Sequence, residues 1–299
     1  MGAAQERQLR RRIKSIEATK KITRAMELIA ASQIARAQER IAQSRPYQIQ
    51  LAKALSNAVG QMDAKSKSLI KEIENPTSLL LLVIAGDRGL CGGYNNFVLR
   101  TAERMIKKLS SEQVKIGTVL VGKKAQAYFK FRKMPVIESF AGMTDRPNYQ
   151  DAEKVSKALL SQRDNFETIK IVSTRFISAA IQKVEIHQLL PIPPEVIEKP
   201  ESQIGPIVEL EPEGSALIDM LVPQYIGAAV FSALLEASAS EHTARQRAMS
   251  SATENAEELI KTLVRQMNRA RQETITTEIM EIVGGAEALR AAELRRKED

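Results

Sequence analysis

The chain has 299 residues, of which 43% are hydrophobic and 4% aromatic, with no Trp and a net charge of +8. Large globular cores usually contain more aromatic side chains, so we expect much of the chain to bury only a narrow apolar seam. The single Cys91 excludes an internal disulfide. The absence of an 18-residue apolar stretch and of a signal-peptide h-region predicts a soluble, cytoplasmic protein without a transmembrane helix.

The positive charge is concentrated at the N-terminus. Residues 1–57 contain twelve Lys and Arg against four acidic residues, which accounts for the whole net charge of +8. A basic helix of this kind indicates an acidic partner, such as nucleic acid, anionic lipid or a carboxylate-rich protein surface.

Both ends of the chain have the pattern of long helices. Residues 3–45 and 228–283 contain neither Gly nor Pro. Helices this long and this charged indicate a coiled coil, and we expect the N- and C-terminal helices to pair with each other in a long antiparallel coiled coil. In the N-terminal segment, apolar residues lie three or four residues apart within each of three sets, and this spacing changes between the sets. The heptad repeat is therefore not strict. The sets are Leu9, Ile13 and Ile16, then Ile22, Met26 and Ile29, then Ile34, Ala37 and Ile41.

Between the two helical ends, strand and helix patterns alternate. Pro46 is expected to mark a kink or a boundary before the helical pattern resumes and fades near residue 75. Strands are predicted at 78–85, 114–121, 135–140, 169–174 and 183–190, and helices at 96–109, 124–131 and 149–162. This alternation is typical of a Rossmann-like α/β domain with a mainly parallel sheet.

Six prolines in residues 191–214 predict an extended linker. A short helix at 215–221 is expected to stop near Pro223, before the long C-terminal helix starts. The predicted organisation is therefore an N-terminal long helix (1–75), an α/β domain with its linker (76–212) and a C-terminal long helix (213–299).

The segment GDRGLCGGYN (86–95) follows a strand and precedes a helix, as a phosphate-binding loop would. Its glycines do not fit G-x-G-x-x-G, so a tight turn is the favoured interpretation. A nucleophilic Cys91 would need a base, and of the two histidines, His187 and His242, the second is expected to lie far from the α/β domain. No cluster has metal-ligand spacing. We expect no catalytic, cofactor or metal site.

Two alternatives follow from these patterns. The strand, glycine-rich turn and helix at 78–109 would suit a nucleotide-dependent α/β enzyme with a coiled-coil arm. The basic N-terminal helix would suit a nucleic-acid-binding coiled coil, although it lacks interleaved aromatic residues and a recognisable docking motif.

Several segments resemble one family. KKITRAMELIAAS (20–32), GDRGLCGGYN (86–95), RQRAMSSATENAEELI (245–260) and EIVGGAEAL (281–289) are similar to the gamma subunit of the F-type rotary ATP synthase. The resemblance covers essentially the whole chain in the order helix, α/β domain, long helix. It implies a non-catalytic rotor: a coiled-coil shaft inside a hexamer of alpha and beta subunits, with the α/β domain as a foot.

The resemblance also implies partners and a location. The foot would rest on the ring of membrane c subunits beside the epsilon subunit, with one gamma copy in the hetero-oligomer. It implies no cofactor and no nucleic acid, and contact with the membrane only through the c ring. The chloroplast members carry an inserted segment with a cysteine pair, which this chain lacks. A peripheral protein on the cytoplasmic face of a bacterial plasma membrane is therefore expected.

Contact residues follow from the resemblance alone. Those expected at the beta-subunit loops and the apolar bearing are Arg24, Met26, Arg245, Gln246, Met249, Thr253, Ile282 and Val283. Those expected where the foot meets the c ring or epsilon are Arg88, Cys91, Tyr94 and Asn95.

Overall fold

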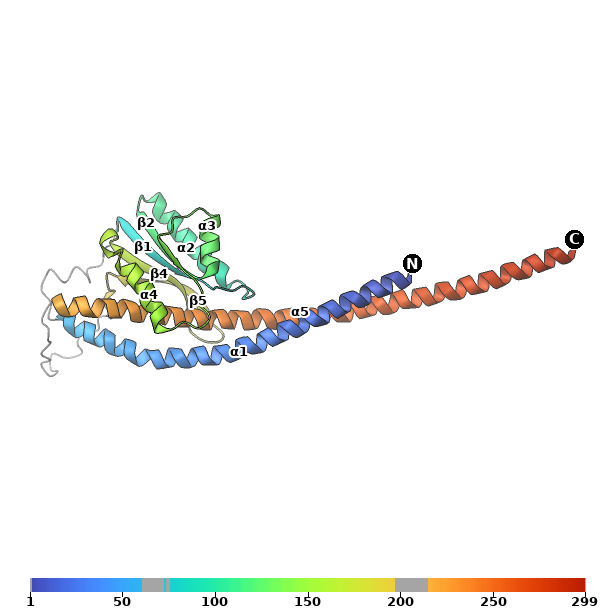
Figure 1. Cartoon of the computed structure of the whole chain (residues 1–299), viewed down its shortest axis with the longest axis horizontal. Coiled ribbons are helices and arrows are strands. Elements are labelled where there is room, and N and C mark those ends of the chain that lie inside the picture. Colours follow the sequence, from blue (N-terminus) through green and yellow to red (C-terminus); the bar gives the residue numbers. More distant parts are fainter. Residues whose placement is uncertain (1, 61–72, 74–75, 197–214, 299) are drawn as a thin grey trace. The chain divides into compact units, whose positions relative to one another are not determined.

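The computed structural model describes residues 2–60, 73, 76–196 and 215–298. Two long helices, α1 (Gly2–Gly60) and α5 (Ser215–Glu298), precede and follow an α/β region in the chain (Figure 1). The elements between them are β1 (Ser78–Ile84), α2 (Tyr94–Ser111), β2 (Lys115–Val121), α3 (Lys123–Phe131), β3 (Glu138–Phe140), α4 (Tyr149–Leu160), β4 (Thr168–Phe176) and β5 (Gln182–Leu190). Two single 3₁₀ turns, Arg163–Asn165 and Pro194–Val196, complete the order. Every strand predicted from the sequence is present, while most of the expected linker lies outside the described residues.

The five strands form one sheet in the order β3-β2-β1-β4-β5. β1 pairs in parallel with both β2 and β4, β2 pairs in parallel with β3, and β5 is an antiparallel edge strand. The chain moves outward from β1 to β3 and then returns to the other side of β1. The strand order therefore reverses between β1 and β4, at the position where open α/β sheets place their ligand crevice.

Both faces of the sheet are covered. β1 is buried along its whole length, and its alternate side chains enter different cores because successive residues of a strand point to opposite faces. Leu80, Leu82 and Ile84 lie in a core with residues of α1, α4 and α5. The intervening Leu79, Leu81 and Val83 lie in a second core with residues of α2 and α3. The sheet thus forms the middle layer of a three-layer arrangement.

The chain divides into two compact units. One unit consists of residues 29–248, and the other consists of residues 1–28 together with residues 249–299. Each terminal helix contributes to both units. The boundaries of the compact units, at residues 28/29 and 248/249, therefore differ from the changes of sequence pattern near residues 75 and 212. We call residues 29–248 the α/β unit and the remaining residues the coil unit.

Neither Pro46 nor Pro223 ends a helix, so the stop expected near Pro223 is wrong, and of the kink or boundary expected at Pro46 the boundary is excluded. α1 continues through Pro46, and α5 is one helix from Ser215 through Pro223. An internal proline costs about 3 kcal/mol because it removes a hydrogen bond and crowds the preceding turn. Buried side chains beside each proline offset this cost: Leu51 and Leu55 follow Pro46, while Val222 and Ile226 flank Pro223.

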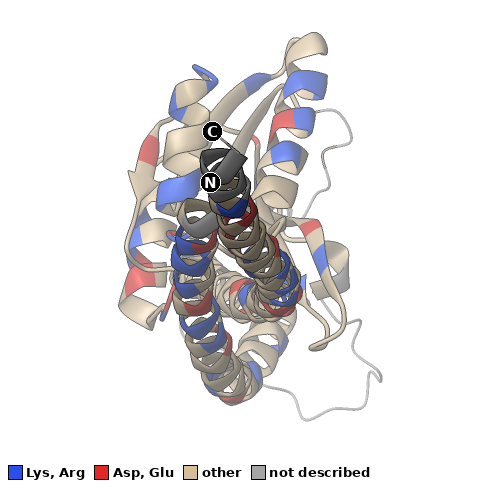
Figure 2. Ribbon diagram, turned by 90° about the vertical axis from the view of Figure 1, so that its right-hand side faces the viewer, with Lys and Arg blue, Asp and Glu red and all other residues tan. Residues whose placement is uncertain are grey.

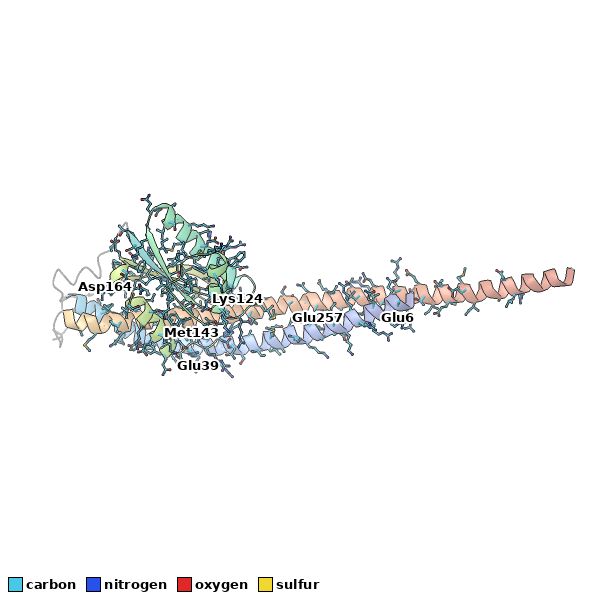
Figure 3. All side chains as sticks on the ribbon, turned by 45° about the horizontal axis from the view of Figure 1, so that its top comes forward. Glu6, Glu39, Lys124, Met143, Asp164 and Glu257 are labelled. Atoms are coloured by element: carbon cyan, nitrogen blue, oxygen red, sulfur yellow. The ribbon has the colours of Figure 1, made fainter. Side chains whose placement is uncertain are left out.

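In the coil unit, α1 and α5 pack in antiparallel orientation. Thr23 Oγ1 and Thr253 Oγ1 share a hydrogen bond of 2.8 Å, and Lys20 Nζ lies 2.6 Å from Glu257 Oε1. Moving toward the N-terminus of α1 therefore moves toward the C-terminus of α5. Figure 2 colours the charged residues along these helices, and Figure 3 labels Glu6 on α1 and Glu257 on α5.

The seam of the coil unit follows a stricter heptad than the apolar pattern predicted. On α5 the buried Met249, Ala256, Leu263 and Ala270 recur every seven residues. On α1 the polar Thr23 continues the register of Leu9 and Ile16, whereas Ile22 is 61% exposed. The expected seam through Ile22 and Ile29 is therefore wrong, since both are 61% exposed; Thr23 lies in the seam instead and hydrogen-bonds across the pair to Thr253.

One helix in the described part of the chain is long and apolar enough to cross a membrane by length and composition. It is the Met220–Arg290 part of α5, whose best window has a mean hydropathy of 1.4 and is 44% buried. The expectation that no such window exists is wrong. Core helices pass the same test, and Val222, Ile226 and Val230 of α5 belong to the core of the α/β unit.

Candidate functional site

The glycine-rich segment 86–95 forms a compact turn at the carboxyl end of β1. Asn95 closes it: its Oδ1 accepts a hydrogen bond from the Gly86 amide at 2.7 Å, and its Nδ2 donates to the Arg88 carbonyl at 3.1 Å. Leu90 and Gly92 have left-handed backbones, with φ of 59° and 56°. The segment is thus the tight turn that the sequence favoured, built around one asparagine side chain.

A side chain of α5 fills the crevice beside this turn. A Cβ added at Gly86 would lie 2.9 Å from the Glu241 carboxylate, so a larger residue at this position would displace the Glu241 side chain. Glu241 is 2% exposed, and its Oε2 has no hydrogen-bond partner among the described residues. A carboxylate at this position opposes an incoming phosphate by both volume and charge.

Glu241 begins a buried polar network. Its Oε1 is ion-paired and hydrogen-bonded with Arg245 Nη2 one turn along α5. Arg245 Nη1 lies 3.3 Å from His242 Nδ1, and His242 Nε2 lies 3.2 Å from the Asp145 carbonyl. Arginine only donates and a carbonyl only accepts, so this geometry requires a neutral His242 protonated at Nε2.

Burial shifts the ionisation of the groups around the turn. It raises the pKa of the Glu241 carboxyl, against the effect of Arg245, and it lowers the pKa of His242. Burial and the nearby Glu241 charge also raise the pKa of Cys91 and raise that of Tyr94 well above its ordinary value. Cys91 is therefore a protonated thiol near neutral pH, which is the opposite of an activated nucleophile.

Asp87 anchors the turn to the loop after β3. Its carboxylate accepts hydrogen bonds from the amides of Lys123, Gly142 and Thr144 and from the Thr144 hydroxyl. Burial alone would raise the pKa of Asp87, but these hydrogen bonds outweigh burial and lower it.

We expect Asp87→Asn to reduce the free energy of unfolding by about 1–3 kcal/mol near neutral pH, since an amide cannot accept from all these donors. A lowered native pKa stabilises the fold above the unfolded-state value of about 3.8 and loses this effect as pH falls through the native value. The gap between wild type and variant should therefore narrow below about pH 3.8. Urea unfolding at several pH values measures it, and a gap that stays constant with pH would contradict this role.

The expectation that His242 lies far from the α/β domain is wrong, because α5 packs directly on the sheet. The network also contains Asp145 and Glu241, which no sequence motif had singled out. One signal was available: Glu241 and Arg245 are one helical turn apart within a segment otherwise rich in small residues.

The four residues expected where the foot meets the c ring or epsilon differ in how exposed their side chains are. Cys91 and Tyr94 are buried, Asn95 is partly buried, and Arg88 is exposed with its guanidinium 3.7 Å from Asp145. The structure brings all of them together in the turn or directly beside it. Arg88 is the one of these four that offers most of its side chain to another molecule.

The shaft residues divide in the same way. Arg24 is exposed and pairs with Glu27 at 2.9 Å, and Met26 is half-buried. On α5, Gln246 is half-buried, whereas the side chains of Met249 and Thr253 are buried in the seam. Arg245 belongs to the buried network of the α/β unit.

The last described turns of α5 expose an apolar surface. Ile282 and Val283 are 72% and 52% exposed, and Ile279 and Met280 beside them are also exposed. Residues 281–290 are exposed without exception. This part of α5 is therefore a helix whose side chains are not covered by any other described residues.

Comparison with known proteins decides the family. A family model described as ATP synthase matches residues 5–289. The ATP synthase gamma chain of Saccharopolyspora erythraea is 42% identical over 97% of this chain and 99% of the relative. That of a Parafrankia species is 44% identical over 96% of this chain and 98% of the relative. The chain belongs to the ATP synthase gamma chain family.

Solved structures share the fold of this gamma-family chain. A chain of the Euglena gracilis mitochondrial ATP synthase, in an OSCP/F1/c-ring structure, has a TM-score of 0.70 at 19% identity, covering 97% of this chain and 96% of its own length. A central stalk/c-ring structure from Tetrahymena thermophila gives 0.58 at 23% identity, covering 77% of this chain and 99% of its own length. At these identities the likeness supports the long terminal helices and the Rossmann-like domain.

Proposed function

We propose that this chain is the central-stalk rotor subunit of an F-type ATP synthase, transmitting torque between a proton-driven c ring and a catalytic alpha/beta hexamer. The observation that carries the proposal is the match to bacterial gamma chains at 42–44% identity across 96–97% of this chain. The proposed partners are the alpha, beta, epsilon and c subunits, with one gamma copy in the complex.

The coil unit has the surface that a rotating shaft needs. Its seam is narrow and made largely of small residues such as Thr23, Ala256 and Ala270, so the helices approach closely and stiffen each other. Outside the seam, exposed residues such as Ile22 and Leu28 alternate with charges. Scattered apolar and charged contacts suit a surface that must exchange partners as it turns, since large aromatic anchors would bind one position too tightly.

We infer further that the chain is a non-catalytic subunit. The Glu241 carboxylate occupies the space beside Gly86, in the crevice where related α/β folds hold phosphates. This arrangement supports a foot domain in which a side chain of α5, and not a nucleotide, occupies the crevice. Hydrolysis and synthesis of ATP are then carried out by the partner subunits.

The proposed location is the cytoplasmic face of a bacterial plasma membrane, with membrane contact only through the c ring. The bacterial origin of the relatives supports this assignment. The charge distribution also fits, because the basic α1 would be attracted to acidic loops of the hexamer.

We propose that the contact residues implied by the resemblance have two different roles, according to whether their side chains are exposed or buried. Exposed or half-exposed side chains are proposed to contact partners directly: Arg24, Met26, Gln246, Ile282 and Val283 at the hexamer, and Arg88 and Asn95 at the foot. The buried residues are proposed to act through position: Arg245, Cys91 and Tyr94 by holding the turn on α5, and Met249 and Thr253 by holding the coil.

Met26→Lys should uncouple proton pumping from ATP hydrolysis. It adds a charge to a half-buried position of an already basic helix, which disturbs packing with α5 and with the hexamer. ATP-driven proton uptake by inverted membrane vesicles, divided by their ATPase rate, should fall strongly. Met26→Leu keeps an apolar side chain of similar volume and should retain the wild-type ratio. An unchanged ratio in Met26→Lys would mean that Met26 contributes only to packing and has no role in coupling.

Composition of the native complex tests the proposal as a whole. The chain is tagged in its own host and purified from detergent-solubilised membranes. We expect alpha and beta ATPase subunits to co-purify with it, with one tagged chain per hexamer. A tagged chain recovered alone or with RNA would refute it.

A further inference from the structure

A cavity lies between the start of α2, the end of β4, the edge strand β5 and α5. Its volume is about 420 Å³, within the range of pockets that bind small molecules. Its walls are mainly apolar, with Tyr94, Phe97, Val184, Ala244 and Ala248 among the lining residues. It therefore occupies the carboxyl side of the sheet, close to where the strand order reverses, which is the usual position for a ligand in such sheets.

The wall of this cavity holds a polar group without a partner. Ser240 is fully buried at 0% exposure, and its hydroxyl has no hydrogen-bond partner among the described residues. A buried hydroxyl left unpaired is costly, so such groups usually face a bound water or ligand. Ser240 lies in the lining of the cavity, where a water molecule can pair with its hydroxyl beside the apolar part of a ligand.

A basic groove continues from the cavity along α2. The two share Phe97, Gln182 and Val184 as lining residues, and the groove measures about 770 Å³. Its cationic residues are Arg100, Arg104, Lys107, Arg132 and Lys183. Lys107 and Arg132 both pair with Glu103, and Lys183 lies 3.6 Å from Glu185.

Arg100 and Arg104 are the uncompensated charges of the groove. Both are exposed, and neither has an acidic partner within 4.0 Å among the described residues. Within the described part of the chain, the guanidinium of Arg104 donates hydrogen bonds to the Thr101 hydroxyl and the Arg100 carbonyl of its own helix. Arginine forks of this kind bind carboxylate and phosphate groups well.

We propose that the cavity and the groove together form a binding site for a small amphipathic anion. The apolar part of the ligand occupies the cavity between Phe97 and Ala248, and its anionic group lies on Arg100 and Arg104. Fatty-acid carboxylates and single-chain phosphate esters share this chemistry. The site is independent of the rotor assignment, because the cavity and the groove are formed entirely by the α/β unit.

Calorimetry on the purified full chain tests the site, with decanoate as the probe and decanol as its uncharged analogue. Dodecyl phosphate then distinguishes a phosphate from a carboxylate preference. Arg100→Gln/Arg104→Gln removes the anion contacts without touching the core. Lys108→Gln is the matched control, since Lys108 is exposed on the same helix but does not line the groove. Ala244→Leu fills the cavity, and circular dichroism checks that each variant folds.

Saturable decanoate binding is expected in wild type and Lys108→Gln. The double arginine variant should bind at least about tenfold more weakly, given the usual strength of hydrogen bonds to charged groups. Ala244→Leu should abolish binding, and decanol should bind weakly. No saturable binding to wild type would overturn the proposal. Equal binding by all variants would also overturn it, because the probe would then be held elsewhere, for example on the exposed end of α5.

Discussion

Arg245→Met should lower the free energy of unfolding by about 3–5 kcal/mol, the usual cost of removing one partner from a buried ion pair. Glu241 and Arg245 have side chains that are only 2% and 8% exposed, so the remaining carboxylate would lie in the interior without its counter-charge. The variant would also remove the donor to His242. Urea denaturation of the purified chain, followed by circular dichroism, measures the loss.

The matched control for this prediction is the double variant Glu241→Met/Arg245→Met. Replacing both charges leaves no unpaired carboxylate, and buried pairs exchanged for apolar residues are often neutral in stability. The double variant should therefore be more stable than Arg245→Met alone. A single variant within about 1 kcal/mol of wild type would show that Glu241 has taken up a proton at little cost.

Gly122→Ala should destabilise the α/β unit by at least about 3 kcal/mol, which is beyond an ordinary surface substitution. Gly122 follows β2 with φ of 100°, and a Cβ there would lie 2.1 Å from the carbonyl oxygen of Ala85. The obstacle is backbone at the end of β1, so no side-chain rotation relieves it. Thermal unfolding of the full chain gives the loss.

Gly142→Ala is the control that separates the strain of a left-handed backbone from the steric clash expected at Gly122. Gly142 also has a left-handed backbone, with φ of 85°, but a Cβ there would meet nothing within 4 Å. Only conformational strain applies, for a loss of about 1 kcal/mol. Equal losses at the two positions would mean that the close approach to Ala85 is relieved by a backbone shift.

The elements of the α/β unit could be predicted from the sequence because their signals are local. The run SLLLLVIA at 78–85 has the apolarity of a strand buried on both faces, and β1 spans Ser78–Ile84 with no exposed residue. The start of α4 at Tyr149 follows from Asn148 and Asp151, which form a capping box. Signals of this kind depend on neighbours within a few residues.

Predictions that depend on distant residues failed. A kink or boundary is predicted at Pro46 and a helix stop near Pro223, yet both helices continue, because buried side chains distant from the local pattern compensate for the prolines. Thr23 was absent from the predicted seam because its partner, Thr253, is 230 residues away in the chain. The candidate site shows the same limit: the local sequence of GDRGLCGGYN predicts a turn, but Glu241 contacts it from α5, a distant part of the chain, and no local pattern indicates that contact.

Rotation of the α/β unit against the hexamer is the most direct test of the proposed rotor. Lys154 is exposed on α4, and Cys91 is buried, so Lys154→Cys gives one accessible thiol for attaching a bead. The complex is purified with its alpha and beta subunits and fixed to a surface through beta. On addition of ATP, we expect the bead to turn continuously in one direction. A bead that stays fixed while the same complexes hydrolyse ATP would contradict it.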